Sequence, residues 1–295
     1  DSLVDGDITT TLTATASNSG GYAGSETATT TVKNTDNETA GITIAQTGST
    51  DGSGNLLTTE AGSTSTFTVV LDAKPTADVT VSITGADSTE HSLSASSLTF
   101  TTSNWNTAQT ITVTGVDDSL DDGDITTTLT ATASNSGGYA GTETATTTLK
   151  TSDNDTAGIT IAQTGTTDGS GNLLTTEAGS TSTFTVVLDA QPTADVTVTL
   201  SGADSTEHSL SSSSLTFTTS NWNTAQTVTV TGVDDSLDDG DITTTLTATA
   251  SNTGGYAGTE TATTTLKTSD NETAGITIAQ TGTTDDSGNL LTTEA

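Results

Sequence analysis

The chain contains no cysteine, and this absence excludes both a disulfide framework and a metal site built from thiolates. The fold must therefore be held together by packing or by a metal ion that oxygen atoms bind. Long hydrophobic runs are absent as well. No stretch approaches the roughly 18 apolar residues that span a bilayer, so we predict no membrane insertion in this segment.

Basic residues are almost missing. Four lysine and arginine residues stand against 37 acidic ones, which gives a formal net charge of -33. A chain this negative is repelled by nucleic acid and by anionic membrane surfaces. The charge therefore excludes nucleic acid as a partner.

What the chain has in place of these features is repetition. Residues Asp118–Asp234 repeat Asp1–Asp117 with scattered substitutions, and a third copy begins at Asp235. A period of 117 residues is one whole domain per repeat, whereas a solenoid turn has about 20 to 50. Since an enzyme gains little from the same active site placed end to end, the array predicts a structural or adhesive protein and no enzyme. The chain begins and stops inside repeats, so we expect a longer array.

Few aromatic residues and abundant threonine are compatible with disorder, but the pattern of the residues favours sheet. Apolar residues alternate with small polar ones in segments that include Phe67–Leu71, Val79–Ile83, Leu98–Phe100, Ile111–Val113, Ile125–Ala131 and Ala145–Leu149. This period of two is typical of half-buried strands, and threonine is β-branched and suits their solvent face. About six or seven strands fit in each unit between Gly-, Asn- and Asp-rich breaks. We predict an all-β chain of tandem antiparallel immunoglobulin-like β-sandwiches.

The expected strands also place the domain boundaries. Gly41–Ile44 is predicted as a first strand and Thr146–Lys150 as a last one. We expect complete repeats at 39–156 and 157–273, the C-terminal part of a repeat at 1–38 and the N-terminal part of another at 274–295. Only Thr156 and Ala157 remain as a linker, so neighbouring domains should abut at a restricted angle.

The acidic residues are clustered. Of the 14 in residues 41–157, nine fall in four short segments: Glu60, Asp87, residues 117–124 and residues 153–155. Such segments can converge at one end of a sandwich, where crowded carboxylates repel one another unless a cation lies between them. Without cysteine and with little histidine, that cation is best identified as Ca²⁺. The alternative is that these are solvated acidic loops that only aid solubility.

At the same segments the chain resembles a known family. Thr58–Gly62, Gly115–Asp124 and Ser152–Ile159 are similar to the three signature stretches of Calx-β domains. Gln191–Val198 and Asn221–Asp235 resemble the Calx-β-like repeats of very large bacterial surface proteins. The resemblance covers each whole repeat. It implies a seven-stranded sandwich with calcium ions at one tip, near the junction with the next domain.

The resemblance also implies which residues bind the metal. Carried over by position, the ligands are Glu60, Asp87, Asp117, Asp118, Asp121, Asp124, Asp153 and Asp155, and in the next repeat Glu177, Asp204, Asp234, Asp235, Asp238, Asp241 and Asp270. In the leading segment Val4 occupies the place of Asp121.

Together these features predict a calcium-stiffened structural repeat of an extracellular or cell-surface bacterial protein. It would extend an adhesin or build a filament or surface layer, with neighbouring repeats of the same chain, and identical chains in a filament, as partners. The alternative is a multivalent glycan-binding array. Trp105 and Tyr139 could then form a sugar-stacking surface, although packing is the other interpretation of both residues. His91 and His208 have no second histidine or cysteine nearby, and we expect them in surface loops.

Overall fold

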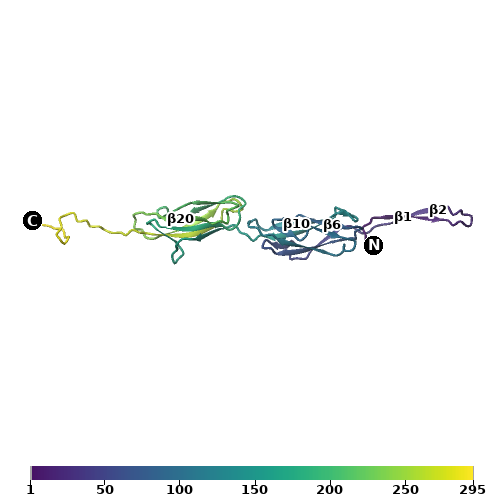
Figure 1. Cartoon of the computed structure of the whole chain (residues 1–295), viewed down its shortest axis with the longest axis horizontal. Helices are drawn as coiled ribbons and strands as arrows, with labels where there is room; N and C mark the ends of the chain where they lie inside the picture. The colour runs from purple at the N-terminus through teal and green to yellow at the C-terminus, as the bar shows by residue number, and fades with distance from the viewer. Residues whose placement is uncertain (1, 295) are drawn as a thin grey trace. The chain divides into compact units, whose positions relative to one another are not determined.

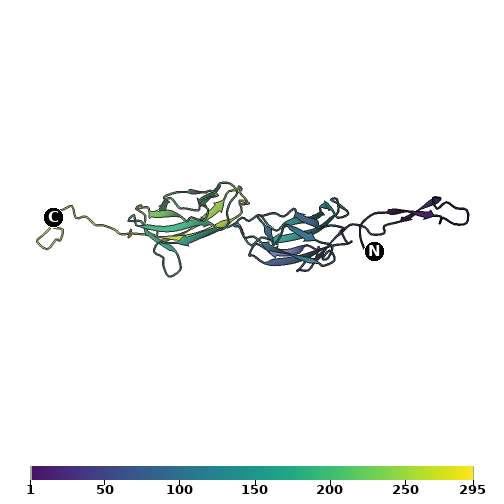
Figure 2. The same cartoon turned by 45° about the vertical axis from the view of Figure 1, so that its right-hand side comes forward.

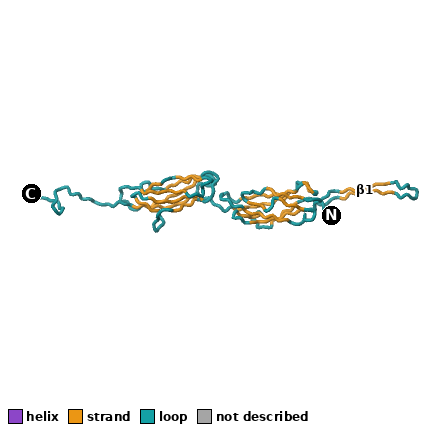
Figure 3. The backbone as a smooth tube through the Cα atoms, viewed as in Figure 1, coloured by secondary structure: helices purple, strands orange, loops and turns teal. Residues whose placement is uncertain are grey.

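The computed structural model describes residues 2–294. The chain divides into two compact units, Asp1–Asp155 and Thr156–Ala295. Strands and loops make up the described residues, and no helix occurs among them (Figure 3). Within this described part, no helix therefore has the length and apolarity needed to cross a membrane. The all-β prediction is confirmed.

The first unit contains a hairpin followed by a sandwich (Figure 1). The hairpin strands are β1 (Ile8–Thr15) and β2 (Thr27–Asn34). The sandwich strands are β3 (Ile42–Gln46), β4 (Leu56–Thr59), β5 (Thr64–Leu71), β6 (Val79–Thr84), β7 (His91–Leu93), β8 (Ser97–Phe100), β9 (Gln109–Gly115), β10 (Ile125–Ala133) and β13 (Thr144–Ser152). Between the last two, β11 (Asn135–Ser136) and β12 (Tyr139–Ala140) form a small separate ribbon.

The sandwich strands form two sheets, which Figure 2 shows as two layers in each unit. One sheet has the order β3-β5-β9-β7 and the other β4-β13-β10-β6-β8. The pairings are antiparallel except that β4 runs parallel to β13, with Leu56 opposite Leu149. The chain changes sheets between β3 and β4, and this change brings the early strand β4 beside the last strand of the repeat.

The second unit repeats this arrangement one period later. Its strands are β14 (Ile159–Gln163), β15 (Leu173–Thr176), β16 (Thr181–Leu188), β17 (Val196–Ser201), β18 (His208–Leu210), β19 (Ser214–Phe217), β20 (Gln226–Gly232), β21 (Ile242–Ala250) and β22 (Thr261–Ser269). The sheets are β14-β16-β20-β18 and β15-β22-β21-β17-β19. The hairpin β1–β2 likewise has the register of β10–β13, with Ile8 opposite Asn34 where Ile125 is opposite Thr151.

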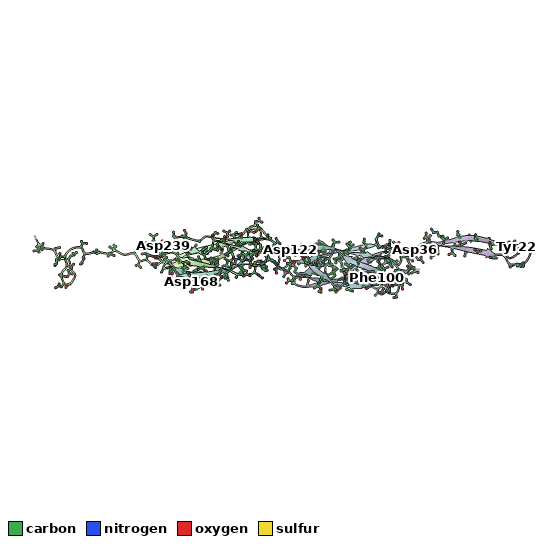
Figure 4. All side chains as sticks on the ribbon, turned by 45° about the horizontal axis from the view of Figure 1, so that its top comes forward. Tyr22, Asp36, Phe100, Asp122, Asp168 and Asp239 are labelled. Carbon is green, nitrogen blue, oxygen red and sulfur yellow. The ribbon has the colours of Figure 1, made fainter. Side chains whose placement is uncertain are left out.

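The core follows the alternation in the sequence. In β5 the side chains of Phe67, Val69 and Leu71 are buried, and Thr68 and Val70 between them lie half-buried on the other face. Phe100 of β8 lies in the same core (Figure 4). Burying a side chain of this size stabilises the folded state by about 1.5 to 3 kcal/mol, so a small set of such residues can hold a threonine-rich domain.

A tyrosine ties the ribbon after β10 to the opposite loop. The Tyr139 hydroxyl donates to the carbonyl of Ala73 at 2.8 Å and accepts from the Ala73 amide at 3.4 Å. Tyr139 is 2% exposed and its counterpart Tyr256 is 3% exposed. Both are therefore packing residues, and neither ring offers an open face on which a sugar could stack.

His91 and His208 are buried, each with an exposed fraction of 1%, so their expected place in surface loops is wrong. His91 opens the short strand β7, which pairs with β9 and turns its first side chain inward. A strand of three residues has no alternation by which the sequence could reveal this. Burial lowers the pKa of both imidazoles, which favours their neutral forms.

Candidate metal centre

In each repeat four acidic segments converge where β4, β9 and β13 end. The amide of Glu60, just after β4, donates to the carbonyl of Ser152 at the end of β13 at 3.1 Å. The amide of Val116, just after β9, donates to the carbonyl of Glu90 at 2.8 Å. A side chain on Gly115 would collide with the carbonyl of Thr59, so glycine permits the ends of β9 and β4 to lie this close. The backbone thus brings the carboxylates together.

Glu60 lies at the centre of this arrangement in the first complete repeat and is 1% exposed. One oxygen each from Glu60, Asp118 and Asp155 lie within 4.8 Å of one another. A second group of the same tightness contains Glu60, Glu90 and Asp122. Since Glu60 belongs to both groups, a single buried carboxylate links two sets of possible ligands.

The repeat 157–273 has the same architecture with two changes in the first group. Glu177 groups with Asp270 and Glu272, and separately with Glu207 and Asp239. Glu272 stands where the first repeat has Asp155, and Asp270 replaces the contribution of Asp118. Figure 4 marks Asp122 and Asp239, which are members of the second group in each repeat.

Burial and mutual repulsion make these carboxyls hard to ionise. Burial raises the pKa of Glu60 from 4.5 to about 7, and the charges of Asp153, Asp118 and Glu90 add to the effect. Burial likewise raises the pKa of Glu90, Asp122 and Asp155. Carboxylates held in this way favour the binding of a cation, which removes the repulsion.

Several oxygens at the centre have no hydrogen-bond partner among the described residues. They are Oε2 of Glu90, Oδ2 of Asp155, Oε2 of Glu207 and Oε2 of Glu272. A buried acceptor without a partner is destabilising and rare, and a bound cation satisfies it. Calcium binds oxygen at about 2.3 to 2.6 Å, so ligands on opposite sides of the ion lie about 5 Å apart. An oxygen-only donor set at this spacing fits Ca²⁺.

Ten of the sequence-predicted ligands lie outside these groups, and four of them, at two equivalent positions, contact a lysine or a threonine side chain. Asp124 contacts the ammonium of Lys150 at 2.6 Å, and Asp241 contacts that of Lys267 at 2.8 Å. These lysines hold the pKa of both carboxyls below the usual range. Asp87 accepts the hydroxyl of Thr89 at 2.7 Å, and Asp204 shows the same contact with Thr206.

The remaining predicted ligands shape the loops around the centre. Asp153 accepts the amide of Gly123 at 2.7 Å with one oxygen and the amide of Asp155 at 2.7 Å with the other. Asp117 accepts the side-chain amide of Asn154 at 3.2 Å. Asp234 repeats this contact with Asn271, and Asp235 accepts the amide of Leu237, as Asp118 does that of Leu120. Asp121 and Asp238 follow in the same two loops, and Asp238 accepts the amide of Ala274.

The sequence did not identify five residues that the structure places in these groups: Glu90, Asp122, Glu207, Asp239 and Glu272. Glu90 precedes a strand too short to show a period, so only the recurrence of Glu-His in both repeats marked it. Asp122 stands in a run of acids in which spacing does not distinguish inward from outward side chains.

No family model matches the sequence, and no curated protein matches it. Solved structures similar to this chain include the CBD12 domains of CALX1.2, with 16% identity over 70% of this chain and 80% of that one and a TM-score of 0.28. The extracellular cadherin domains 1–5 of protocadherin gamma B2 are 13% identical over 92% of this chain and 47% of that one, with a TM-score of 0.36. A protein of unknown function from Porphyromonas gingivalis W83 is 8% identical over 77% of this chain and 99% of that one, with a TM-score of 0.27. Scores this low carry no argument about function, and the fold stands on the structure itself.

The raised pKa of Glu60 predicts how stability depends on pH without metal. The folded state holds a proton that the unfolded state releases, so this contribution is fully present below pH 4.5 and is lost as pH rises through about 7. We expect the melting temperature in chelator to fall between pH 5 and pH 8. With calcium the ion replaces the proton, and the fall should disappear. Thermal melts at several pH values test this, and a melting temperature in chelator that rises across the range would contradict it.

Proposed function

We propose that this chain is a calcium-binding structural repeat segment of a secreted or cell-surface bacterial protein. The observation that carries the proposal is the buried Glu60, which belongs to both clusters of acidic residues. One cluster contains Asp155 and the other Glu90, and each of these has a buried oxygen without a hydrogen-bond partner. Solvated acidic loops do not explain it, because a carboxylate that only aids solubility has no reason to be buried without a partner.

The ion would act by joining segments that are distant in the sequence. Glu60 follows β4, Asp118 follows β9 and Asp155 follows β13. Bound to all three, calcium would neutralise their repulsion and fasten the last strand to the start of the repeat. Glu90 and Asp122 would hold a second ion beside it, again with Glu60 as the shared ligand.

Binding at this place would also restrain the chain that leaves the repeat. Asp155 is two residues before Ala157, where the next repeat is expected to begin. In the second unit, Asp238 of the acidic loop accepts the amide of Ala274, beyond the last strand β22. An ion that holds the acidic loop in one conformation would therefore also hold the segment that follows the last strand. This supports a calcium-stiffened extender of an adhesin, or a unit of a filament or surface layer in which identical chains are partners.

Small-angle scattering of the whole chain tests this function. We expect a narrower distribution of distances between the two complete repeats in millimolar calcium than in chelator, because the ion restrains the segment after Asp155. Circular dichroism under both conditions should show that the repeats stay folded. Identical distributions with folded repeats would mean that calcium serves only the single domain, and the stiffening function would be wrong.

A further inference from the structure

A short segment before the hairpin lies against a loop of the following repeat. Leu3 forms a parallel bridge with Lys74, which lies in the loop between β5 and β6. The Lys74 amide donates to the carbonyl of Ser2 at 2.8 Å, and the Val4 amide donates to the carbonyl of Lys74 at 3.2 Å. A side chain on Gly138 would collide with the carbonyl of Val4, so the segment also packs closely on the ribbon β11–β12.

Repetition identifies this segment as an acidic loop. Ser2–Val4 corresponds to Ser119–Asp121 and Ser236–Asp238, which follow the proposed ligands Asp118 and Asp235. The corresponding Leu237 is 63% exposed, whereas most large apolar side chains of the second sandwich are buried. Gly21, which corresponds to Gly138, has nothing within 4 Å of where a side chain would begin. The chain therefore shows the contact itself at Leu3 and Lys74. It also shows an acidic loop with an exposed leucine at Leu237, and a ribbon glycine in open space at Gly21.

The receiving loop is built for such a contact. Lys74 precedes Pro75, and a residue before proline is held in the extended conformation that a β-bridge requires. The only two prolines in the sequence are Pro75 and Pro192, and both stand at this place in their repeats. The Thr76 amide donates to the carbonyl of Gly137 at 2.9 Å, which fixes the loop against the ribbon. The bridge uses only the backbone groups of Lys74. Gln191, which stands at this position in the next repeat, can therefore form the same bridge.

We propose that this surface, formed by the pre-proline loop and the glycine ribbon, docks the acidic loop of the preceding repeat. Its partner is thus another repeat of the same array, recognised by backbone hydrogen bonds and by one apolar side chain. The docking adds a partner to the proposed function and rests on it only through calcium. The Leu237 amide donates to the carboxylate of Asp235 at 2.7 Å, so an ion bound at that carboxylate would set the conformation of the docking loop.

Amide hydrogen exchange in the full chain tests the docking. Replacing Val4 by proline removes the donor to Lys74, and we expect the Lys74 amide to exchange about five to ten times faster, as the loss of an ordinary hydrogen bond gives. Val4→Ala keeps the amide and should exchange as the natural chain does. The Thr76 amide is the internal control, because its bond lies within the receiving loop and should keep its protection.

A second pair of variants examines the other side of the contact. Gly138→Ala should accelerate exchange at Lys74, whereas Gly21→Ala, at a similar positive φ but in open space, should not. If Gly138→Ala disturbs the receiving loop itself, the Thr76 amide will also exchange faster. The comparison of Val4→Pro with Val4→Ala then decides whether the docking exists. Equally fast exchange of Lys74 in the natural chain and in Val4→Pro would overturn the docking. The calcium response depends on Glu60 and not on Val4, so failure of the docking and failure of calcium binding are distinguishable.

Discussion

We expect millimolar calcium to raise the melting temperature of this protein markedly and chelator to lower it. Extracellular calcium modules have dissociation constants of about 10⁻⁴ to 10⁻³ M, and ligand at about 100 times the constant adds roughly 2.7 kcal/mol per site. For a domain of this size that is a rise of roughly 10 °C. The partnerless oxygens of Glu90 and Asp155 are the physical reason, because the ion satisfies both.

Two controls separate binding from general screening of charge. A chain with a net charge of -33 is stabilised by any salt, so sodium chloride at equal ionic strength must be compared. Magnesium is the second control, because it requires octahedral coordination with short metal–oxygen distances and loses its bound water reluctantly. We expect both to shift the melt much less than calcium. A melting temperature that does not change between chelator and millimolar calcium would rule out the calcium function.

Local pattern predicted most strands but could not predict how they pair. Strands β5, β6, β9, β10 and β13 contain stretches in which apolar and small polar residues alternate, and these stretches predict each of them. Strand β4 has Leu56 and Leu57 side by side, and β7 has three residues, so neither shows a period. The parallel pairing of β4 with β13 joins residues far apart in the sequence, and no local pattern encodes such a contact.

The position of the acidic cluster could be predicted, whereas the direction of each side chain could not. Composition and spacing indicated that acids near Glu60, Asp118 and Asp155 gather at one end of the sandwich. Which acids face inward depends on loop geometry and on neighbours. Asp124 lies just before β10, where the register places Lys150 nearby, and its carboxylate pairs with that lysine and belongs to neither group.

Removing the shared carboxylate should have opposite effects with and without calcium. Glu60→Gln together with Glu177→Gln takes one ligand oxygen from both groups in each repeat, so we expect the calcium shift to be largely lost. In chelator at pH 8 the repeat 39–156 should become more stable than in the natural chain. A glutamine there carries no charge, and its carbonyl can still accept the amide of Asn154, which now lies 3.3 Å from Glu60.

The size of the gain in chelator follows from the pKa of Glu60. A rise from 4.5 to about 7 means that the buried charge destabilises the metal-free repeat by on the order of 3 kcal/mol at pH 8. Scanning calorimetry should therefore show the variant melting above the natural chain in chelator and below it in calcium. The matched control is Asp78→Asn with Asp195→Asn, which removes the same charge from exposed positions outside the groups. If both double variants kept the same response to calcium, diffuse screening would explain the stabilisation and Glu60 would not be a ligand.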